Sequence, residues 1–229
     1  MQDKRFPSSQ NDDLSTVMNA SGQKAALESS AASVLKNTYL LLGLTIAFSA
    51  LTAFLSMDLP RPGFLITLVG FYGLFFLTAK LRNSPLGILS TFALTGFMGY
   101  TLGPLIGMFA GAGAMPVVMN ALGLTAFVFF GLSAYALTTR KDFNFLGGFL
   151  TAGFFVLIGA MVLGMFTQIA GLHLMISAGF VLFSSAAILY QTGAIINGGE
   201  RNYVMATISL YVSIYNIFVS LLSILGSND

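Results

Sequence analysis

Charged residues are scarce in this chain, and cysteine is absent. Lys, Arg, Asp and Glu make up 8% of the 229 residues, against roughly 25% in a typical soluble domain. The lack of cysteine excludes a disulfide framework, a thiolate metal site and a cysteine nucleophile. The few basic residues do not form a patch, so we expect no nucleic-acid partner.

Two long stretches contain no Lys, Arg, Asp or Glu at all: residues 83–139 and residues 143–199. Each is too long to be one buried element of a soluble core, and each is about the length of two membrane crossings joined by a tight turn. Hydrophobic residues make up 56% of the whole chain. The sequence therefore predicts an all-α polytopic membrane protein.

Seven apolar runs have the length of a membrane span, roughly 17–25 residues. Turn residues such as Pro60, Pro62 and the Asn197-Gly198-Gly199 tripeptide separate them. We expect seven transmembrane helices, over residues 37–57, 63–79, 86–110, 116–137, 146–166, 172–196 and 203–225. The third could instead break at Pro104.

The basic residues predict the orientation of the chain. With the N-terminus in the cytoplasm, nine of the ten Lys and Arg residues are cytoplasmic, and Arg61 alone is on the opposite side. Cytoplasmic loops carry the excess of Lys and Arg in membrane proteins. We therefore expect a cytoplasmic N-terminus and, after seven crossings, a C-terminus on the outer side.

Residues 1–33 differ from the rest of the chain. They are rich in Ser, Asn, Gln, Asp and Ala and lack any long apolar run, so they cannot bury enough surface to offset the entropy cost of ordering. We expect a disordered cytosolic N-terminal tail over 1–33 and a seven-helix membrane domain over 34–229. The tail is either a simple leader or a segment that a partner engages.

Four glycines recur at every fourth position of the third predicted helix: Gly99, Gly103, Gly107 and Gly111. Small residues at this spacing let a neighbouring helix approach closely. A flexible hinge around Pro104 is the alternative. We expect close packing.

Polar side chains recur along one face of the last predicted helix, within an arc of about 80°. They are Ser209, Ser213, Asn216, Ser220 and Ser223. The preceding helix repeats Ser177, Ser184 and Gln191 at intervals of seven. Lipid offers such groups no partner, so both faces should turn inward. They either form hydrogen bonds between helices or line a polar cavity between the last two helices, open toward the cytoplasm.

The residue types that catalysis needs are missing from the predicted spans. None contains Lys, Arg, Asp or Glu, which argues against a proton-coupled pump. The single histidine, His173, falls near the outer end of the sixth span, where an interfacial role is expected and a catalytic base is the alternative. Neither a His-Glu-x-x-His nor a Gly-x-Ser-x-Gly motif is present. We expect no enzyme activity, no cofactor and no metal site.

Two short segments carry a resemblance to a known family. Ile188-Leu189-Tyr190-Gln191-Thr192 and residues 210–216, LYVSIYN, resemble the paired C-terminal motifs of the transmembrane Bax inhibitor family. The likeness covers essentially the whole chain after the tail. Residues 36–39, 68–73, 138–142 and 216–222 are similar to the bacterial branch that modulates the FtsH protease. The resemblance implies two three-helix layers around a central C-terminal helix.

The same resemblance implies a function. A protein of this kind is a non-enzymatic modulator of the ATP-dependent membrane protease FtsH and acts as its inhibitor and slow substrate. The resemblance also implies a location in the bacterial cell inner membrane, with a periplasmic C-terminus. The implied partners are that protease, its membrane regulators and the lipid bilayer. The tail would be the handle that the protease engages, with Met1, Lys4, Arg5, Asp12 and Asp13 as its candidate residues.

A cation leak is the alternative function that the resemblance allows. Family members described as pH-sensitive calcium leaks carry an aspartate in each C-terminal motif, and two facing carboxylates can share a proton. Gln191 and Ser213 occupy the aligned positions here. They can form a hydrogen-bonded latch, but a proton could not release it. Ser184, Ser209 and Asn216 are the further candidates for lining such a path.

Overall fold

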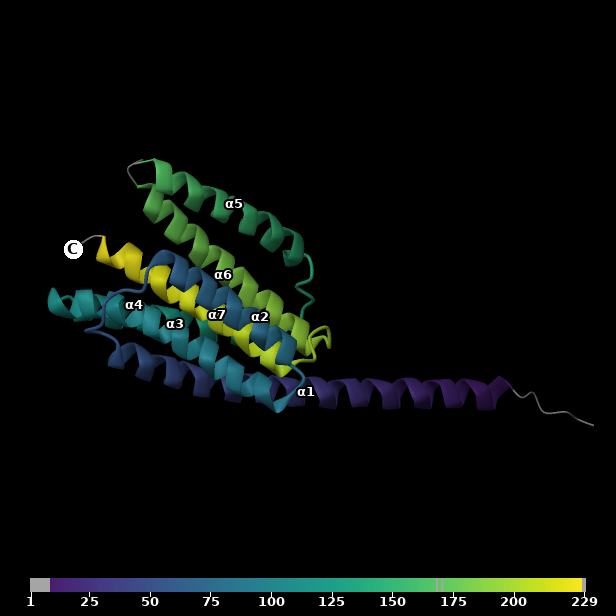
Figure 1. Cartoon of the computed structure of the whole chain (residues 1–229). Helices are drawn as coiled ribbons and strands as arrows, with labels where there is room; N and C mark the ends of the chain where they lie inside the picture. The colour runs from purple at the N-terminus through teal and green to yellow at the C-terminus, as the bar shows by residue number, and fades with distance from the viewer. Residues whose placement is uncertain (1–8, 168, 170, 228–229) are drawn as a thin grey trace, which may run out of the picture.

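The computed structural model describes the backbone of residues 9–167, 169 and 171–227, and the side chains from Glu28 onward within these ranges except that of Met165. The described residues form seven helices and no strand (Figure 1). The helices are α1 (Ser9–Leu55), α2 (Phe64–Leu81), α3 (Pro85–Gly111), α4 (Met115–Thr139), α5 (Leu146–Phe166), α6 (Leu172–Ile196) and α7 (Tyr203–Gly226).

The seven predicted spans are confirmed. Each of the seven helices contains a segment long and apolar enough to cross a membrane, which in α1 is Glu28–Leu55. Prolines stand in the first turns of α3 and α4, where no backbone N–H is needed for the helix. Pro104 does not break the third helix, because α3 continues on both sides of it.

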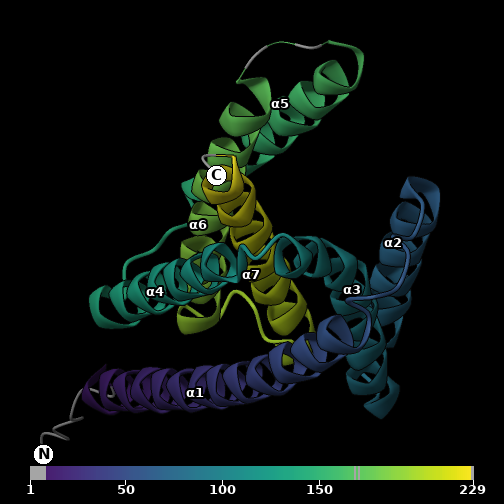
Figure 2. The same cartoon turned by 90° about the vertical axis from the view of Figure 1, so that its left-hand side faces the viewer.

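The C-terminal helix α7 lies at the centre of the molecule (Figure 2). It contacts α1 and α3 on one side and α4 and α6 on the other, while α2 packs on α3 and α5 on α6. The predicted arrangement of two three-helix layers around a central helix is therefore confirmed, with α1–α3 in one layer and α4–α6 in the other. Ile208, Leu210 and Ile217 of α7 are completely buried, whereas α2 has one buried residue, Thr78.

The first helix begins earlier than the sequence predicts. The expectation of an unstructured segment up to residue 33 differs from the structure, in which α1 begins at Ser9 and extends beyond the other helices (Figures 1 and 2). The Ala, Gln, Lys, Glu and Leu residues over 23–28 favour a helix through that part of α1. Among the side chains of α1 that the structure describes, which begin at Glu28, the first fully buried one is Thr38. Met1, Lys4 and Arg5 lie outside the described residues, as do the side chains of Asp12 and Asp13.

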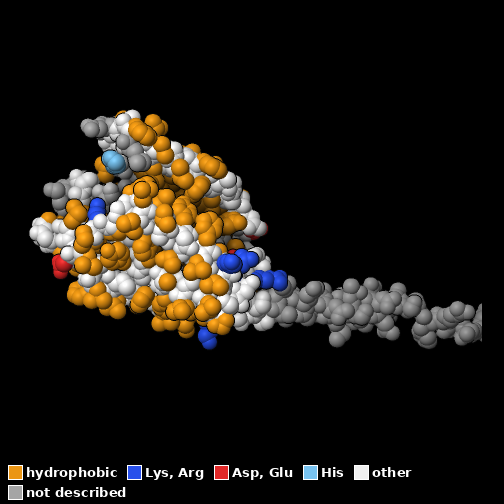
Figure 3. All heavy atoms as spheres, in the orientation of Figure 1, with side chains coloured by type: hydrophobic (Ala, Val, Ile, Leu, Met, Phe, Trp, Pro, Cys, Tyr) orange, Lys and Arg blue, Asp and Glu red, His pale blue; other side chains and the backbone are white. Residues whose placement is uncertain are grey.

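The outer surface of the helical body is strongly apolar. Large hydrophobic side chains such as Phe76 and Phe155 are more than 60% exposed, and hydrophobic atoms spread over the face in Figure 3, with basic side chains near the end from which α1 projects. Such a surface is stable in hydrocarbon and unfavourable in water. The solvent for most of this fold is therefore lipid.

Candidate functional site

Two tyrosines on the central helix α7 connect it to the α1–α3 layer. The Tyr211 hydroxyl donates to the carbonyl of Thr95 (3.2 Å) and lies 2.5 Å from Ser49 Oγ. Because this hydroxyl has one proton, its oxygen accepts from Ser49. One turn later, the Tyr215 hydroxyl is 3.2 Å from Thr101 Oγ1. Polar groups of α1, α3 and α7 thus have hydrogen-bond partners inside the apolar body.

The predicted polar face of α7 turns toward the interior along most of its length. Ser213 and Ser220 are buried, Ser209 and Asn216 are half-buried, and Ser223 is exposed. Ser223 accepts from Ser177 Oγ of α6 (3.2 Å). Ser213 Oγ donates to the Ser209 carbonyl within its own helix (2.9 Å). Among the described residues, this polar face therefore contributes one hydrogen bond between α6 and α7, near the C-terminal end of α7.

Gln191 and Ser213 form no hydrogen bond with each other in the described part of the chain. Ser213 is bonded to Ser209, and Gln191 Nε2 is buried without a partner. Ser184 Oγ and Thr192 Oγ1 of the same helix are also buried and unpaired among the described residues. An unpaired buried polar group costs about 1–3 kcal/mol. The interior face of α6 is thus polar, but the latch between the two motifs is not formed.

The glycine series of α3 faces α1. A Cβ on Gly99 would collide with the Ser49 carbonyl, one on Gly103 with the Ala53 carbonyl, and one on Gly107 with the Met57 carbonyl. Gly111 has nothing within 4 Å of that position. The three contacts bring the backbones of α1 and α3 together, as small residues do in membranes. Across this glycine seam (Gly99, Gly103 and Gly107 against α1), Ser56 Oγ donates to the Tyr100 carbonyl (3.2 Å).

Asn202 anchors the other end of α7. Its side-chain oxygen accepts from the backbone N–H of Met205 (3.0 Å), which caps the helix. Its Nδ2 donates to the carbonyl of Arg82 (3.1 Å) and to Asn83 Oδ1 (2.8 Å) in the α2–α3 loop. The start of the central helix is therefore tied to the loop that joins two helices of the first layer.

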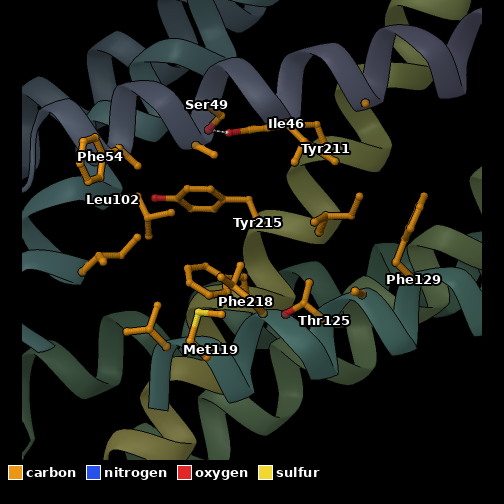
Figure 4. Close-up of a pocket in the computed structure, with 18 of the residues that line it drawn as sticks. Ile46, Ser49, Phe54, Leu102, Met119, Thr125, Phe129, Tyr211, Tyr215 and Phe218 are labelled. Carbon is orange, nitrogen blue, oxygen red and sulfur yellow. Dashed lines mark hydrogen bonds between the residues drawn. The ribbon is translucent and has the colours of Figure 1, made fainter. Parts of the chain in front are cut away.

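An apolar cavity of about 580 Å³ lies between α1 and α4 and against α7, away from the interval between α6 and α7 where the sequence predicted one (Figure 4). Its floor includes Tyr211, Tyr215 and Phe218 of α7 and Leu102 of α3, and no residue of α6 lines it. No Asp, Glu, Lys, Arg or His is among the lining residues. In chemical terms this site can hold hydrocarbon, and it offers no charged ligand to a cation. Among the described residues, no cluster of His, Asp and Glu could hold a metal ion.

Sequence reasoning from the serines overlooked the two tyrosines. Tyr211 and Tyr215 stand four residues apart and hence share a face of the helix. A tyrosine hydroxyl within a membrane span needs a hydrogen-bond partner. The spacing of these two tyrosines therefore predicts helix contacts on the face of α7 opposite to α6.

Seven membrane-length helices, six of them around a buried central one, with a hydroxyl network and no charged side chain buried among those described, define a helical multi-pass membrane protein. The family model described as inhibitor of apoptosis-promoting Bax1 matches residues 31–229. The chain therefore belongs to the Bax inhibitor family.

Several relatives are similar along most of their length. An uncharacterized protein of Pseudomonas aeruginosa is 67% identical over 196 residues, which cover 84% of this chain and 88% of that one. The "Modulator of FtsH protease YccA" of Escherichia coli K12 is 60% identical over 195 residues, covering 84% and 89%. An uncharacterized membrane protein of Vibrio cholerae is 44% identical over 197 residues, covering 84% and 88%.

Proposed function

We propose that this protein is a non-enzymatic modulator of an FtsH-type ATP-dependent protease in the bacterial inner membrane. The observation that carries the proposal is the 60% identity, over nearly the whole helical body, to a protein named for that role. A second Escherichia coli relative of the same identity is named an inner membrane protein. The protein acts as a slow substrate that occupies the protease and so limits the degradation of other substrates.

The arrangement of α1 supports this mechanism. Residues 9–33 form the first part of α1, which extends away from the packed body (Figure 1). A protease that pulls on this end applies force first to α1. Farther along, α1 is held by the glycine seam against α3 and by the Ser49–Tyr211 hydrogen bond to α7. Extraction must therefore separate close backbone contacts as well as side chains, which makes it slow.

The alternative of a cation leak receives no support from the cavity described above. The cavity lining has no carboxylate, and Gln191 and Ser213 cannot share a titrating proton. We therefore propose protease modulation alone, with the N-terminus on the cytoplasmic side where the protease acts.

A pull-down from membranes tests the proposal. The full chain and a form lacking residues 1–30 are each expressed with the protease and solubilised in mild detergent. We expect the full chain to capture the protease, with inactive protease giving the higher yield because the complex is not consumed. Failure of the full chain to capture even inactive protease contradicts the proposal.

A further inference from the structure

The cavity between α1 and α4 is a groove with buried walls at its base and exposed rims. Leu42, Val118, Tyr211 and Phe218 at its base are at most 4% exposed. The rims are exposed apolar side chains from the two helices that flank the opening: Ile46, Phe54, Met115, Met119, Leu122 and Phe130. The groove therefore opens sideways, between α1 and α4, toward the medium that surrounds the helices.

The two ends of the groove differ. At one end, the rings of Tyr39 on α1 and Phe129 on α4 approach to 5.9 Å between centroids, so side chains bridge the two helices. At the other end the lining runs to Met57, just beyond α1, and Met115, the first residue of α4. A chain-like occupant can enter at the Met57 end and stops at the Tyr39–Phe129 pair.

The dimensions of the groove decide which occupant it can take. From Tyr39 to Met57 the groove follows α1 for roughly 27 Å, at 1.5 Å per residue. The empty space between the side chains, with its open side included, is about 1570 Å³, which over that length is a cross-section of about 58 Å². Apolar chains in contact lie about 4–4.5 Å apart, so one hydrocarbon chain takes up on the order of 20 Å² and fits. A helix about 10 Å wide needs roughly 80 Å², so a partner's transmembrane helix does not fit within the groove.

The polar atoms in the groove give no reason for water to fill it. The hydroxyls of Ser49, Tyr211, Tyr215 and Thr125 all have protein partners. The Tyr39 hydroxyl, at the closed end, is buried without a partner among the described residues, and one hydroxyl offers a water molecule fewer than the two to four partners it needs. Water molecules in this space would form fewer hydrogen bonds than in bulk water. If the space were empty, the side chains of its walls would lose van der Waals contacts. We propose that the groove is a binding site for one acyl chain of a membrane phospholipid, which enters from the leaflet at the Met57 end.

Photolabelling in liposomes tests this site on the full chain. The probe is a phosphatidylethanolamine with a diazirine in the middle of one acyl chain. We expect labelled peptides to contain the rim residues Phe54, Met119 and Leu122. Equal labelling of exposed residues on the outer helices, such as Leu65 of α2 and Phe155 of α5, would show ordinary lipid contact and overturn the proposal.

Two variants fill the groove from opposite walls. Gly43 lines it and has nothing within 4 Å of a built Cβ, and Ala126 lies on the opposite helix. Gly43→Phe and Ala126→Phe should each reduce labelling of Met119 by about tenfold, because the ring takes the place of the chain's contacts. Gly123→Phe is the matched control: Gly123 also has open space around it but does not line the groove, so labelling should remain at the parent level.

Folding and competing occupants are checked in the same preparation. Circular dichroism and gel filtration test whether each variant is folded. If a variant is not folded, the smaller substitution Gly43→Leu replaces it. Unchanged labelling in folded groove-filling variants overturns the proposal. A photo-reactive amino acid at Met119 that crosslinks another protein chain in native membranes and captures no lipid also overturns it, in favour of a helix-docking surface.

Discussion

The Tyr211 hydroxyl on the central helix lies 2.5 Å from Ser49 Oγ on the first helix. These residues are separated by 162 positions in the sequence, and the same hydroxyl also reaches the Thr95 carbonyl of α3. One side chain therefore ties the central helix to both helices that form the glycine seam.

Replacing Tyr211 by Phe should destabilise the helical body. The ring stays in its buried place, but the bonds to Ser49 and Thr95 are lost. Hydrogen bonds between membrane helices contribute about 0.6 kcal/mol on average and at most roughly 1.7, so the free energy of unfolding should fall by about 1–2 kcal/mol. Denaturation in mixed detergent micelles measures this. Tyr72→Phe, at a 42% exposed position on α2, is the matched control and should be close to neutral.

Adding a methyl group at the glycine seam should separate α1 from α3. A Cβ at Gly103 meets the Ala53 carbonyl, which is backbone and cannot rotate away. Gly103→Ala should lower the unfolding free energy by about 1–3 kcal/mol, as overpacking does. Gly111→Ala has open space and should be neutral or slightly stabilising, since Ala is the better helix former. Equal effects at both positions would contradict the close approach.

The same pair of variants connects packing to the proposed function. If slow extraction depends on the seam, Gly103→Ala should be degraded faster by the active protease than the parent chain, and Gly111→Ala should not. A pulse-chase with and without active protease measures both half-lives. Parent-like half-lives for a measurably destabilised Gly103→Ala would show that the seam does not limit extraction.

Orientation can be tested by cysteine labelling, because the natural chain has no cysteine. Ser84→Cys, between α2 and α3, should react only with a reagent that enters the cytoplasm. Ala112→Cys, between α3 and α4, and Ser227→Cys, after α7, should react with an impermeant reagent from outside. The expectation follows from the excess of basic residues on the cytoplasmic side. A protected Ser227→Cys would mean that the orientation is wrong.

The contact between α6 and α7 should not respond to pH. Gln191 and Ser213 do not ionise, so spin-label distances between the two helices should be nearly constant from about pH 5 to 8. A sharp change in that window would contradict this. It would direct attention to His173, exposed at the start of α6, or to Glu200 in the α6–α7 loop, each then tested by substitution with Gln.

Removal of the N-terminal segment tests its role as the protease handle. A chain lacking residues 1–30 keeps Lys36, Lys80 and Arg82 for orientation and should still insert and fold. It should persist much longer than the full chain in a pulse-chase, since an unfoldase needs a free segment to begin pulling. It should also inhibit more strongly if it still binds through its membrane helices. Equally fast protease-dependent decay of both forms would show that the segment is not the starting point.

The sequence by itself determined the number of membrane helices and, apart from the start of the first, their bounds. Charges are excluded from hydrocarbon at a cost of several kcal/mol, so the uncharged stretches 83–139 and 143–199 mark pairs of spans without knowledge of any contact. Turn residues such as Pro85 placed the ends to within a few residues. The central place of α7 was implied by the family resemblance, because a polar face alone does not say which helix it meets.

Only the tertiary structure decided which side chains meet. The spacing of Gly99, Gly103 and Gly107 indicates a close neighbour, but that the neighbour is α1 depends on the packing of the whole bundle. The serines of α7 drew attention to α6, whereas the Tyr211 and Tyr215 hydroxyls bond to α1 and α3. The groove lies where α1, α3, α4 and α7 leave space between them. The position of the groove could not be predicted from the apolar runs, since the side chains that face lipid and those that face the groove are both mainly apolar.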